Sequence, residues 1–207
     1  MFDSLPQGAK LIVSAVEIVD NKLSDLLETD DMNKGTKRIP GIDVGSNGST
    51  VIIGSTEVEC YSVPKTFDLL CHAFEKSRRC STGNKAQSHV VFALKCDSKL
   101  SQGCFYIVNV AGLAGGNDDG FVSNDLQHLS KVLKSVLHNK PLSAKSSENL
   151  ITRLLADPLS GKAHTSLVIT VSPCDSCLND SFATIKFGQR IRLIEVNFSK
   201  KKNYFKK

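Results

Sequence analysis

The chain has 207 residues, enough for one domain with a sizeable hydrophobic core. Apolar residues make up 41% of it, yet no apolar run approaches the length of a membrane span, which argues against a membrane-spanning protein. The first residues, MFDSLPQGAK, lack the basic start and apolar middle of a secretory signal. We therefore expect a cytosolic or nuclear protein without a membrane partner.

The net charge of +5 comes from 26 basic and 21 acidic side chains, and residues 200–207 (KKKNYFKK) concentrate much of the excess. Such a segment attracts acidic polymers, for example nucleic acid or the acidic surface of tubulin. The simpler interpretation of this segment is a solvated chain end. We expect no nucleic-acid partner.

The seven cysteines are an odd number at irregular spacing, which favours reduced thiols. Cys174 and Cys177 have the C-x-x-C spacing of a zinc knuckle. No second such pair completes four ligands, so we expect no metal site.

The first half of the chain contains patterns for both strands and helices. In chain order, they predict a strand at 11–19, a short helical turn at 23–27, a polar surface loop at 28–40, small hairpin strands within 42–60, and a helix at 66–79. The helix is predicted from Phe67, Leu70 and Phe74, which share one face at helical spacing.

The second half continues in the same manner. In chain order, it predicts a hairpin of two central strands at 88–94 and 105–110, a flexible glycine-rich loop at 112–120, an amphipathic helix at 126–137, a helix at 150–155 closed off by Pro158 and Gly161, a strand buried on both faces at 167–171, and a closing helix. The closing helix carries Leu178, Phe182 and Ile185 at helical spacing, and Asp175 and Ser176 are its expected caps. These elements together predict an α/β domain with a largely central sheet.

Three stretches of this chain resemble the kinesin motor domain. LITRLLADPLSGKAHTSLVITVSP, followed by FATIKFGQR, resembles the last helix, loop, strand and helix of that domain, and VSAVEIVDNKLSDLL resembles one of its central strands. The resemblance implies a truncated kinesin-like motor domain at residues 1–198, comprising the C-terminal two thirds of the family's domain, and a basic tail at residues 199–207. The implied fold is a partial kinesin-type P-loop NTPase: a central mixed β-sheet flanked by helices, lacking the N-terminal strands and the P-loop.

The nucleotide loops of the family are absent or altered in this sequence. The P-loop motif G-x-x-x-x-G-K-S/T, whose amides cradle phosphates, does not occur. We therefore expect no cofactor, with ATP and magnesium bound only if a P-loop segment is supplied elsewhere.

The two switch motifs also depart from the family. The stretch TGNKAQSH resembles the family's switch one, N-x-x-S-S-R-S-H. In this alignment Ala86 stands where the family has a serine, Gln87 where it has the arginine, and Ser88 matches its last serine. Asn84 is an alternative match for the family's asparagine. The stretch NVAGLA resembles switch two, D-L-A-G-S-E, with Gly112 kept. There Asn109 replaces the aspartate and Ala114 the glutamate. The resemblance implies that these six positions, 86–88, 109, 112 and 114, are vestigial and that no catalytic residue remains.

The microtubule-facing positions are retained in part. Arg153 matches the family, whereas Ser147 and Leu150 stand where it has basic residues. Lys131, Lys134 and Lys145 are further candidates for microtubule contact, although exposed lysines on a helix are commonly only solubilising.

The resemblance therefore implies a kinesin-like module that binds microtubules or a catalytically competent kinesin, associated with the cytoskeleton in the cytoplasm, without autonomous ATPase activity. The alternative is a portion of an ATP-dependent microtubule motor whose P-loop segment is missing from this chain. A third possibility is a decayed gene without a stable product.

Overall fold

The computed structural model describes residues 9–29, 39–44, 50–80, 88–98, 102–111, 149–159 and 163–192. The chain divides into two compact units. Unit 1 comprises Met1–Asp43 and Ile52–Ala111, and unit 2 comprises Val44–Val51 and Gly112–Lys207. Each unit is described by itself.

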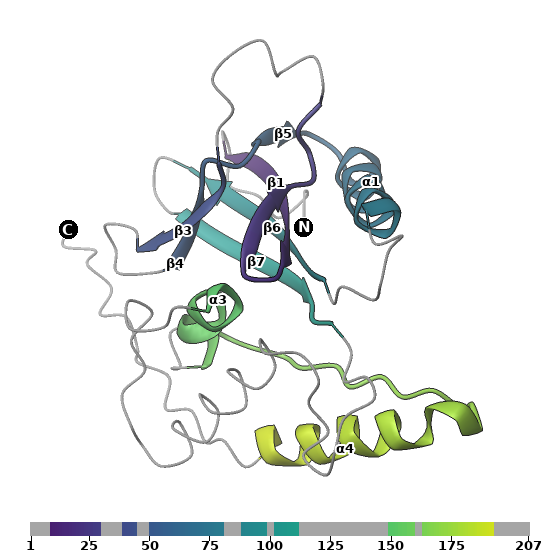
Figure 1. Cartoon of the computed structure of the whole chain (residues 1–207). Helices are drawn as coiled ribbons and strands as arrows, with labels where there is room; N and C mark the ends of the chain where they lie inside the picture. Colours follow the sequence, from purple (N-terminus) through teal and green to yellow (C-terminus); the bar gives the residue numbers. More distant parts are fainter. Residues whose placement is uncertain are drawn as a thin grey trace, which may run out of the picture. The chain divides into compact units, whose positions relative to one another are not determined.

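Unit 1 is organised around a five-stranded sheet (Figure 1). Its strands are β1 (Lys10–Val19), β2 (Lys22–Asp25), β5 (Val58–Cys60), β6 (His89–Asp97) and β7 (Gln102–Asn109). The order is β2-β1-β6-β7, and β5 pairs with β1 beside β2. The predicted strand at 11–19 is confirmed as β1, and the predicted strands at 88–94 and 105–110 are confirmed as the β6–β7 hairpin. The expected central position holds for β6 and is wrong for β7, which ends the strand order of the described sheet and leaves Phe105 55% exposed.

The pairings of this sheet are all antiparallel. The expected mixed sheet is therefore not found among the described strands, because β1–β2 and β6–β7 are hairpins with short connections and antiparallel pairs need no crossover helix. The broader α/β class is confirmed, while the P-loop NTPase fold stays a prediction.

Strand β1 is the centre of the core of unit 1. Its edges are both occupied, one by β6 and the other by β5 and then β2. Val13, Ala15 and Val16 are fully buried, so side chains on both faces of the strand are covered. A near-continuous apolar run such as LIVSAVEIV is typical of a strand buried on both faces.

The helical turn expected at 23–27 is wrong, because the chain reverses direction at Asp20 and Asn21. Both residues have positive φ, 47° and 58°. A two-residue turn with two positive φ angles matches the twist of a hairpin, and Asp and Asn tolerate that conformation. Lys22 therefore pairs with Val19, and residues 22–25 form β2.

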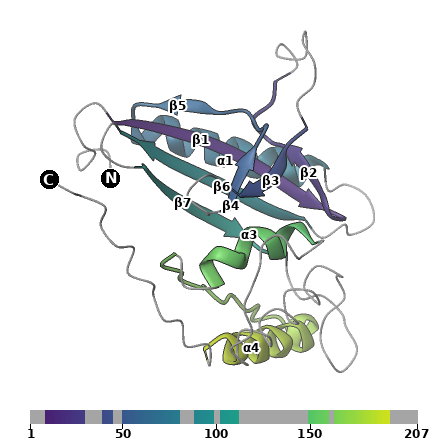
Figure 2. The same ribbon diagram turned by 90° about the vertical axis from the view of Figure 1, so that its left-hand side faces the viewer.

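Helix α1 (Val63–Cys80) covers one face of the sheet, where it runs behind β1 and β6 (Figure 2). It confirms the helix predicted at 66–79. Leu70 and Phe74 pack against the core cluster, and Ala73 is fully buried between them on the same face. The expected placement of Phe67 on this face is wrong, since its side chain is 61% exposed.

Two further short strands, β3 (Gly41–Val44) and β4 (Thr50–Ile53), form a separate two-stranded sheet and confirm the small strands expected in this region. Gly54 follows β4 with a φ of +73°, and a Cβ atom there would lie 2.8 Å from the carbonyl oxygen of Ile39. Only glycine fits this position without strain.

The described part of unit 2 contains α3 (Leu150–Leu159), the short 3₁₀ helix η4 (Asp175–Cys177) and α4 (Leu178–Arg192). Both helices confirm the prediction, although α3 continues through Pro158. Asn149 caps α3 because its Oδ1 accepts a hydrogen bond from the Thr152 amide at 3.1 Å.

The strand predicted at 167–171 is wrong. Residues 164–173 have no regular secondary structure, and the side chain of Val168 is 82% exposed. The segment instead runs along α4 (Figure 1), where a Cβ atom on Gly188 would lie 3.0 Å from Ile169 Cγ1. Within the described part of the chain no strand pairs with it, so its β-branched side chains have no sheet to join.

Asp175 and Ser176, the expected caps of the closing helix, lie within η4, directly before α4. The N-cap residue of η4 is Cys174, whose side chain makes no capping hydrogen bond. Leu178, Phe182 and Ile185 are exposed, and Phe187 is the buried residue of α4.

Several predictions lie outside the described residues: the loop at 112–120, the helix at 126–137 and the tail at 199–207. Among the helices that the structure describes, none is long and apolar enough to cross a membrane.

Candidate functional site

The structure describes two of the six vestigial switch positions, Ser88 and Asn109. Residues 86, 87, 112 and 114 lie outside the described ranges. Ser88 directly precedes β6, and Asn109 is the last residue of β7. Because β6 and β7 are antiparallel and Val90 pairs with Asn109, the start of one strand and the end of the other meet at one end of the sheet.

A hydrogen bond joins the two candidate switch segments directly. The backbone amide of Ala111, two residues beyond β7, donates to Nδ1 of His89 at 3.0 Å. The His89 side chain is 0% exposed. An imidazole nitrogen accepts a hydrogen bond only when it carries no proton, so this contact requires Nδ1 to be unprotonated.

A second group of hydrogen bonds ties the same sheet end to β1 and α1. The hydroxyl of Ser77 in α1 donates to Glu17 Oε1 in β1 at 2.6 Å. The same hydroxyl lies 3.3 Å from the hydroxyl of Ser88. Glu17 and Ser77 are each 4% exposed. We name Glu17, Ser77, Ser88 and His89 the sheet-end cluster.

Sequence reasoning missed Glu17 and Ser77, although the sequence carries a signal for each. Glu17 is the one charged residue in the apolar run LIVSAVEIV, and a charged side chain within a buried strand requires a partner. Ser77 follows Phe74 by three residues and Ala73 by four, which places it on the buried face of α1.

The hydrogen bonds of the sheet-end cluster connect β1, α1 and the start of β6. Its single carboxylate, Glu17, is buried and accepts a hydrogen bond from Ser77. Among the residues that the structure describes, no group of three or more His, Cys, Asp or Glu side chains is positioned to hold a metal ion. The described geometry therefore positions Ser88 and Asn109 at the same end of the sheet.

Of the candidate microtubule contacts, the structure describes Arg153 alone, since Lys131, Lys134 and Lys145 lie outside the described residues. Arg153 is half-buried on α3, and its amide donates to the Asn149 carbonyl at 3.0 Å.

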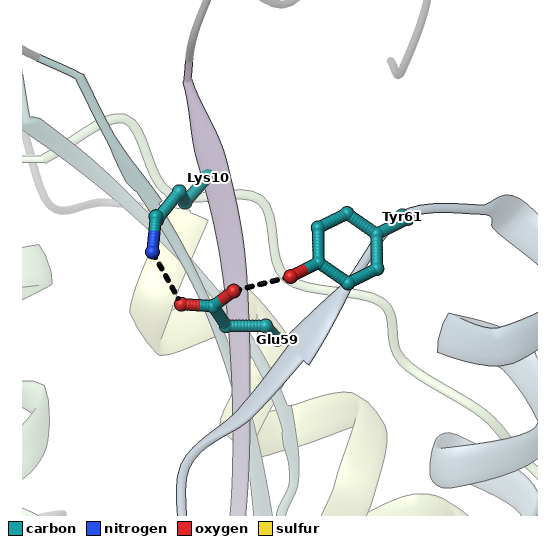
Figure 3. Close-up of polar contacts among 3 residues, drawn as sticks. All are labelled: Lys10, Glu59 and Tyr61. Atoms are coloured by element: carbon teal, nitrogen blue, oxygen red, sulfur yellow. Dashed lines mark hydrogen bonds and ion pairs between the residues drawn. The ribbon is translucent and has the colours of Figure 1, made fainter.

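An exposed polar network lies at the far end of β1 from the cluster (Figure 3). Lys10 Nζ donates to Glu59 Oε1 at 2.7 Å, and the Tyr61 hydroxyl donates to Glu59 Oε2. The hydrogen bond with Lys10 lowers the pKa of Glu59 and, in return, raises the pKa of Lys10. The hydrogen bond to Glu59 raises the pKa of the Tyr61 phenol. These groups are solvated, so we expect the ion pair to contribute little to stability.

Comparison with known proteins connects this geometry to a family. The family model "Kinesin motor domain" matches residues 3–194. The kinesin-like protein KIN-5B of Oryza sativa subsp. japonica is 26% identical over 209 residues, covering 88% of this chain and 20% of the relative. Kinesin-like protein Klp61F of Drosophila melanogaster is 27% identical over 206 residues, covering 88% of this chain and 19% of the relative. The kinesin heavy chain of Botryotinia fuckeliana is 26% identical over 202 residues, covering 88% of this chain and 22% of the relative.

The observed fold is an α/β domain in which two motif-bearing strand ends meet at one end of a sheet. With the family model matching nearly the whole length, the chain belongs to the kinesin motor domain family. It spans about a fifth of the length of the curated relatives that it matches.

Proposed function

We propose that this chain is a kinesin-like module that associates with microtubules or with a catalytically competent kinesin, and that it has no ATPase activity of its own. The observation that carries the proposal is the strand register at the sheet end. It brings Asn109 beside the start of β6, where Ser88 and His89 match the family's Ser-His. This neighbourhood supports the assignment of Asn109 to the position of the switch-two aspartate.

The chemistry at that position supports a degenerate nucleotide site. A magnesium ion is held through carboxylates and substrate phosphates, and the neutral amide of Asn109 supplies no charge for it. The sequence contains no G-x-x-x-x-G-K-S/T, so it offers neither the phosphate cradle nor its lysine. Ala86 and Ala114 lack the hydroxyl and the carboxylate of the family's motifs. Each departure independently removes a group that phosphoryl transfer uses.

Microtubule association is proposed from family membership and from charge. Proteins of the kinesin motor domain family generally bind microtubules, whose tubulin surface is acidic. The chain carries a net charge of +5, and we propose Lys131, Lys134, Lys145 and Arg153 as the contacts. Cationic side chains attract an acidic surface with a strength that falls as salt rises. We therefore propose a cytoskeletal location for the protein.

The test is co-sedimentation of the complete chain with polymerised tubulin, with ADP, with a non-hydrolysable ATP analogue and without nucleotide. We expect salt-sensitive pelleting that is the same in all three conditions, and phosphate release no faster than from microtubules alone. Microtubule-stimulated ATP hydrolysis at ordinary motor rates would refute the proposal. So would a failure to pellet at low salt together with a failure to bind an active kinesin.

A charge-matched pair of variants tests the proposed contacts. Lys131→Glu with Lys134→Glu should weaken pelleting by about tenfold, the effect of losing roughly 1.4 kcal/mol of binding free energy. Lys22→Glu with Lys65→Glu changes the net charge equally at two exposed positions of unit 1 and should weaken it much less. Equal losses in both double variants would show that net charge alone drives association.

The second candidate function is a part of an ATP-dependent microtubule motor whose P-loop segment lies outside this chain. This second candidate is favoured by the small share of the relatives that the chain matches, since the match extends over only about a fifth of their length. The genomic sequence upstream provides the test: an in-frame G-x-x-x-x-G-K-S/T motif would support this candidate. Even then, Asn109 predicts slow turnover, and Asn109→Asp in the extended protein should raise the rate of hydrolysis.

A further inference from the structure

The cysteines 174 and 177 lie together in one hydrogen-bonded turn at the start of η4. The Cys177 amide donates to the Cys174 carbonyl at 2.9 Å. A four-residue turn closed in this way brings its first and fourth Cα atoms within about 7 Å. Disulfides join Cα atoms that are about 4.4–6.8 Å apart. The backbone therefore already holds the two cysteines at a separation that a disulfide can span.

This turn is fixed by contacts that do not involve the thiols. The Cys174 amide donates to Ser172 Oγ at 3.2 Å. The hydroxyl of Ser181, in the first turns of α4, accepts from the Ser172 amide at 3.3 Å and donates to the Ser172 carbonyl at 3.2 Å. Both arms of the turn are thus anchored to each other before any sulfur–sulfur bond forms. Such an arrangement reduces the entropy lost when the two thiols join.

Both thiols are accessible to a small reagent, since Cys174 is exposed and Cys177 is half-buried. Each is a free thiol in the structure. Two cysteines alone do not complete a zinc site of four ligands, and no third ligand joins them among the described residues.

None of the other described cysteines shares a four-residue turn with a second cysteine; half-buried Cys96, for example, lies opposite Gly103 in the strand register. Cys60 is buried and its thiol lies 3.8 Å from the Val58 carbonyl. Cys104 lies opposite Lys95 in the strand register, and desolvation of its thiol raises its pKa, which lowers the thiolate fraction. Cys71 is exposed on α1, on a different element from any other described cysteine except Cys80 at the end of the same helix.

We propose that Cys174 and Cys177 form a site of reversible oxidation, which closes to an intramolecular disulfide by exchange with a small disulfide such as oxidised glutathione. The Cys174 thiolate attacks one sulfur of glutathione disulfide, forms a mixed disulfide and releases one glutathione thiolate, which takes up a proton. The Cys177 thiolate then attacks the Cys174 sulfur and releases the second glutathione. Two protein thiols are oxidised, and one glutathione disulfide is reduced to two thiols.

The experiment incubates the complete chain in glutathione buffers of increasing oxidised fraction, blocks remaining thiols with an alkylating agent, and maps the peptides by mass spectrometry. We expect the peptide that contains both cysteines to lose both alkylation sites together. Its mass should be about 2 Da lower than that of the same peptide with two unmodified thiols, because closure removes two hydrogen atoms. Cys71 and Cys104 in the same sample are internal references and should remain alkylated or carry glutathione.

Two variants make the order of the steps visible. Cys177→Ser should accumulate glutathione on Cys174, whereas Ser176→Ala, which keeps both thiols, should close as the wild type does. Far-ultraviolet circular dichroism checks that each variant folds, which is expected because residue 176 is exposed and residue 177 is only half-buried. The proposal is overturned if wild-type Cys174 retains glutathione without closure. It is also overturned if the pair stays alkylated under conditions that modify Cys71.

Discussion

Residues 11–19 and 167–171 share a β-branched, apolar composition, yet only the first segment forms a strand. β1 has neighbours on both edges and is buried on both faces. The segment of unit 2 lies along α4 with its side chains exposed, and no described strand pairs with it. The difference teaches that β-propensity records how a side chain packs against neighbouring strands, so the same residues remain irregular where neighbours are lacking.

The largest expected effect comes from truncating one side chain in each region. Phe92→Ala removes a ring that is 1% exposed in the centre of β6 and should cost about 3–5 kcal/mol of the free energy of unfolding. Val168→Ala should change it by less than about 0.5 kcal/mol, because that side chain is mostly exposed. Urea denaturation followed by circular dichroism gives both values. A comparable loss for Val168→Ala would show that the segment is packed after all.

The next largest effect is expected where polar groups are buried in the sheet of unit 1. Ser77→Ala removes the hydroxyl that donates to Glu17 and should cost about 1–3 kcal/mol, since a buried carboxylate loses a partner. The double variant with Glu17→Gln should cost less than the sum of the two single changes. Additive losses in this cycle would mean that the two side chains do not interact.

A smaller effect is expected at the link between the two strand ends. His89→Leu removes the acceptor of the Ala111 amide and should lower the free energy of unfolding by about 1 kcal/mol. This is a small loss for a broken hydrogen bond, because Ala111 is only half-buried. The readout is hydrogen exchange of the Ala111 amide, which should accelerate in the variant. The Leu94 amide, within the β6 ladder, serves as the reference and should exchange as before. Unchanged exchange at Ala111 would remove the proposed link.

The smallest effect is expected at the surface network of Lys10, Glu59 and Tyr61. The lowered pKa of Glu59 means that its contribution is present above its ordinary value of 4.5 and is lost as pH falls through the lowered value. The raised pKa of Lys10 means that its contribution is lost as pH rises beyond 10.5 through the raised value. Glu59→Gln should therefore lower the Tm only at pH values between the lowered pKa of Glu59 and the raised pKa of Lys10. The decrease should be slight, because the groups are solvated. A Tm difference that persists at a pH well below the lowered pKa of Glu59 would contradict this explanation.

The fold of unit 1 follows closely from local sequence patterns. Strand β1, the β6–β7 hairpin and helix α1 form where their apolar patterns predict them, and their bounds differ from the prediction by a few residues. The β1–β2 hairpin was not predicted, because Asp20-Asn21 was interpreted as a strand break, whereas their positive φ angles make them a hairpin turn.

The candidate site was only partly predictable. Ser88 and Asn109 were found by motif resemblance, and the register then brought their strand ends together. Glu17 and Ser77 come from elements far apart in sequence, so no local pattern connects them. The error at 167–171 has a similar cause: composition indicates a strand, but pairing partners are a property of the whole fold.

The register of β1 also has a consequence for how the protein is made. Lys10 pairs with Asp97, whereas the β1–β2 and β6–β7 hairpins join residues close in sequence. Ribosomes add about 5–20 residues per second, so β1 spends several seconds without β6 during synthesis. Over that interval the apolar run LIVSAVEIV has β2 as its nearest partner. The nascent chain therefore exposes this apolar hairpin before the core of unit 1 can close.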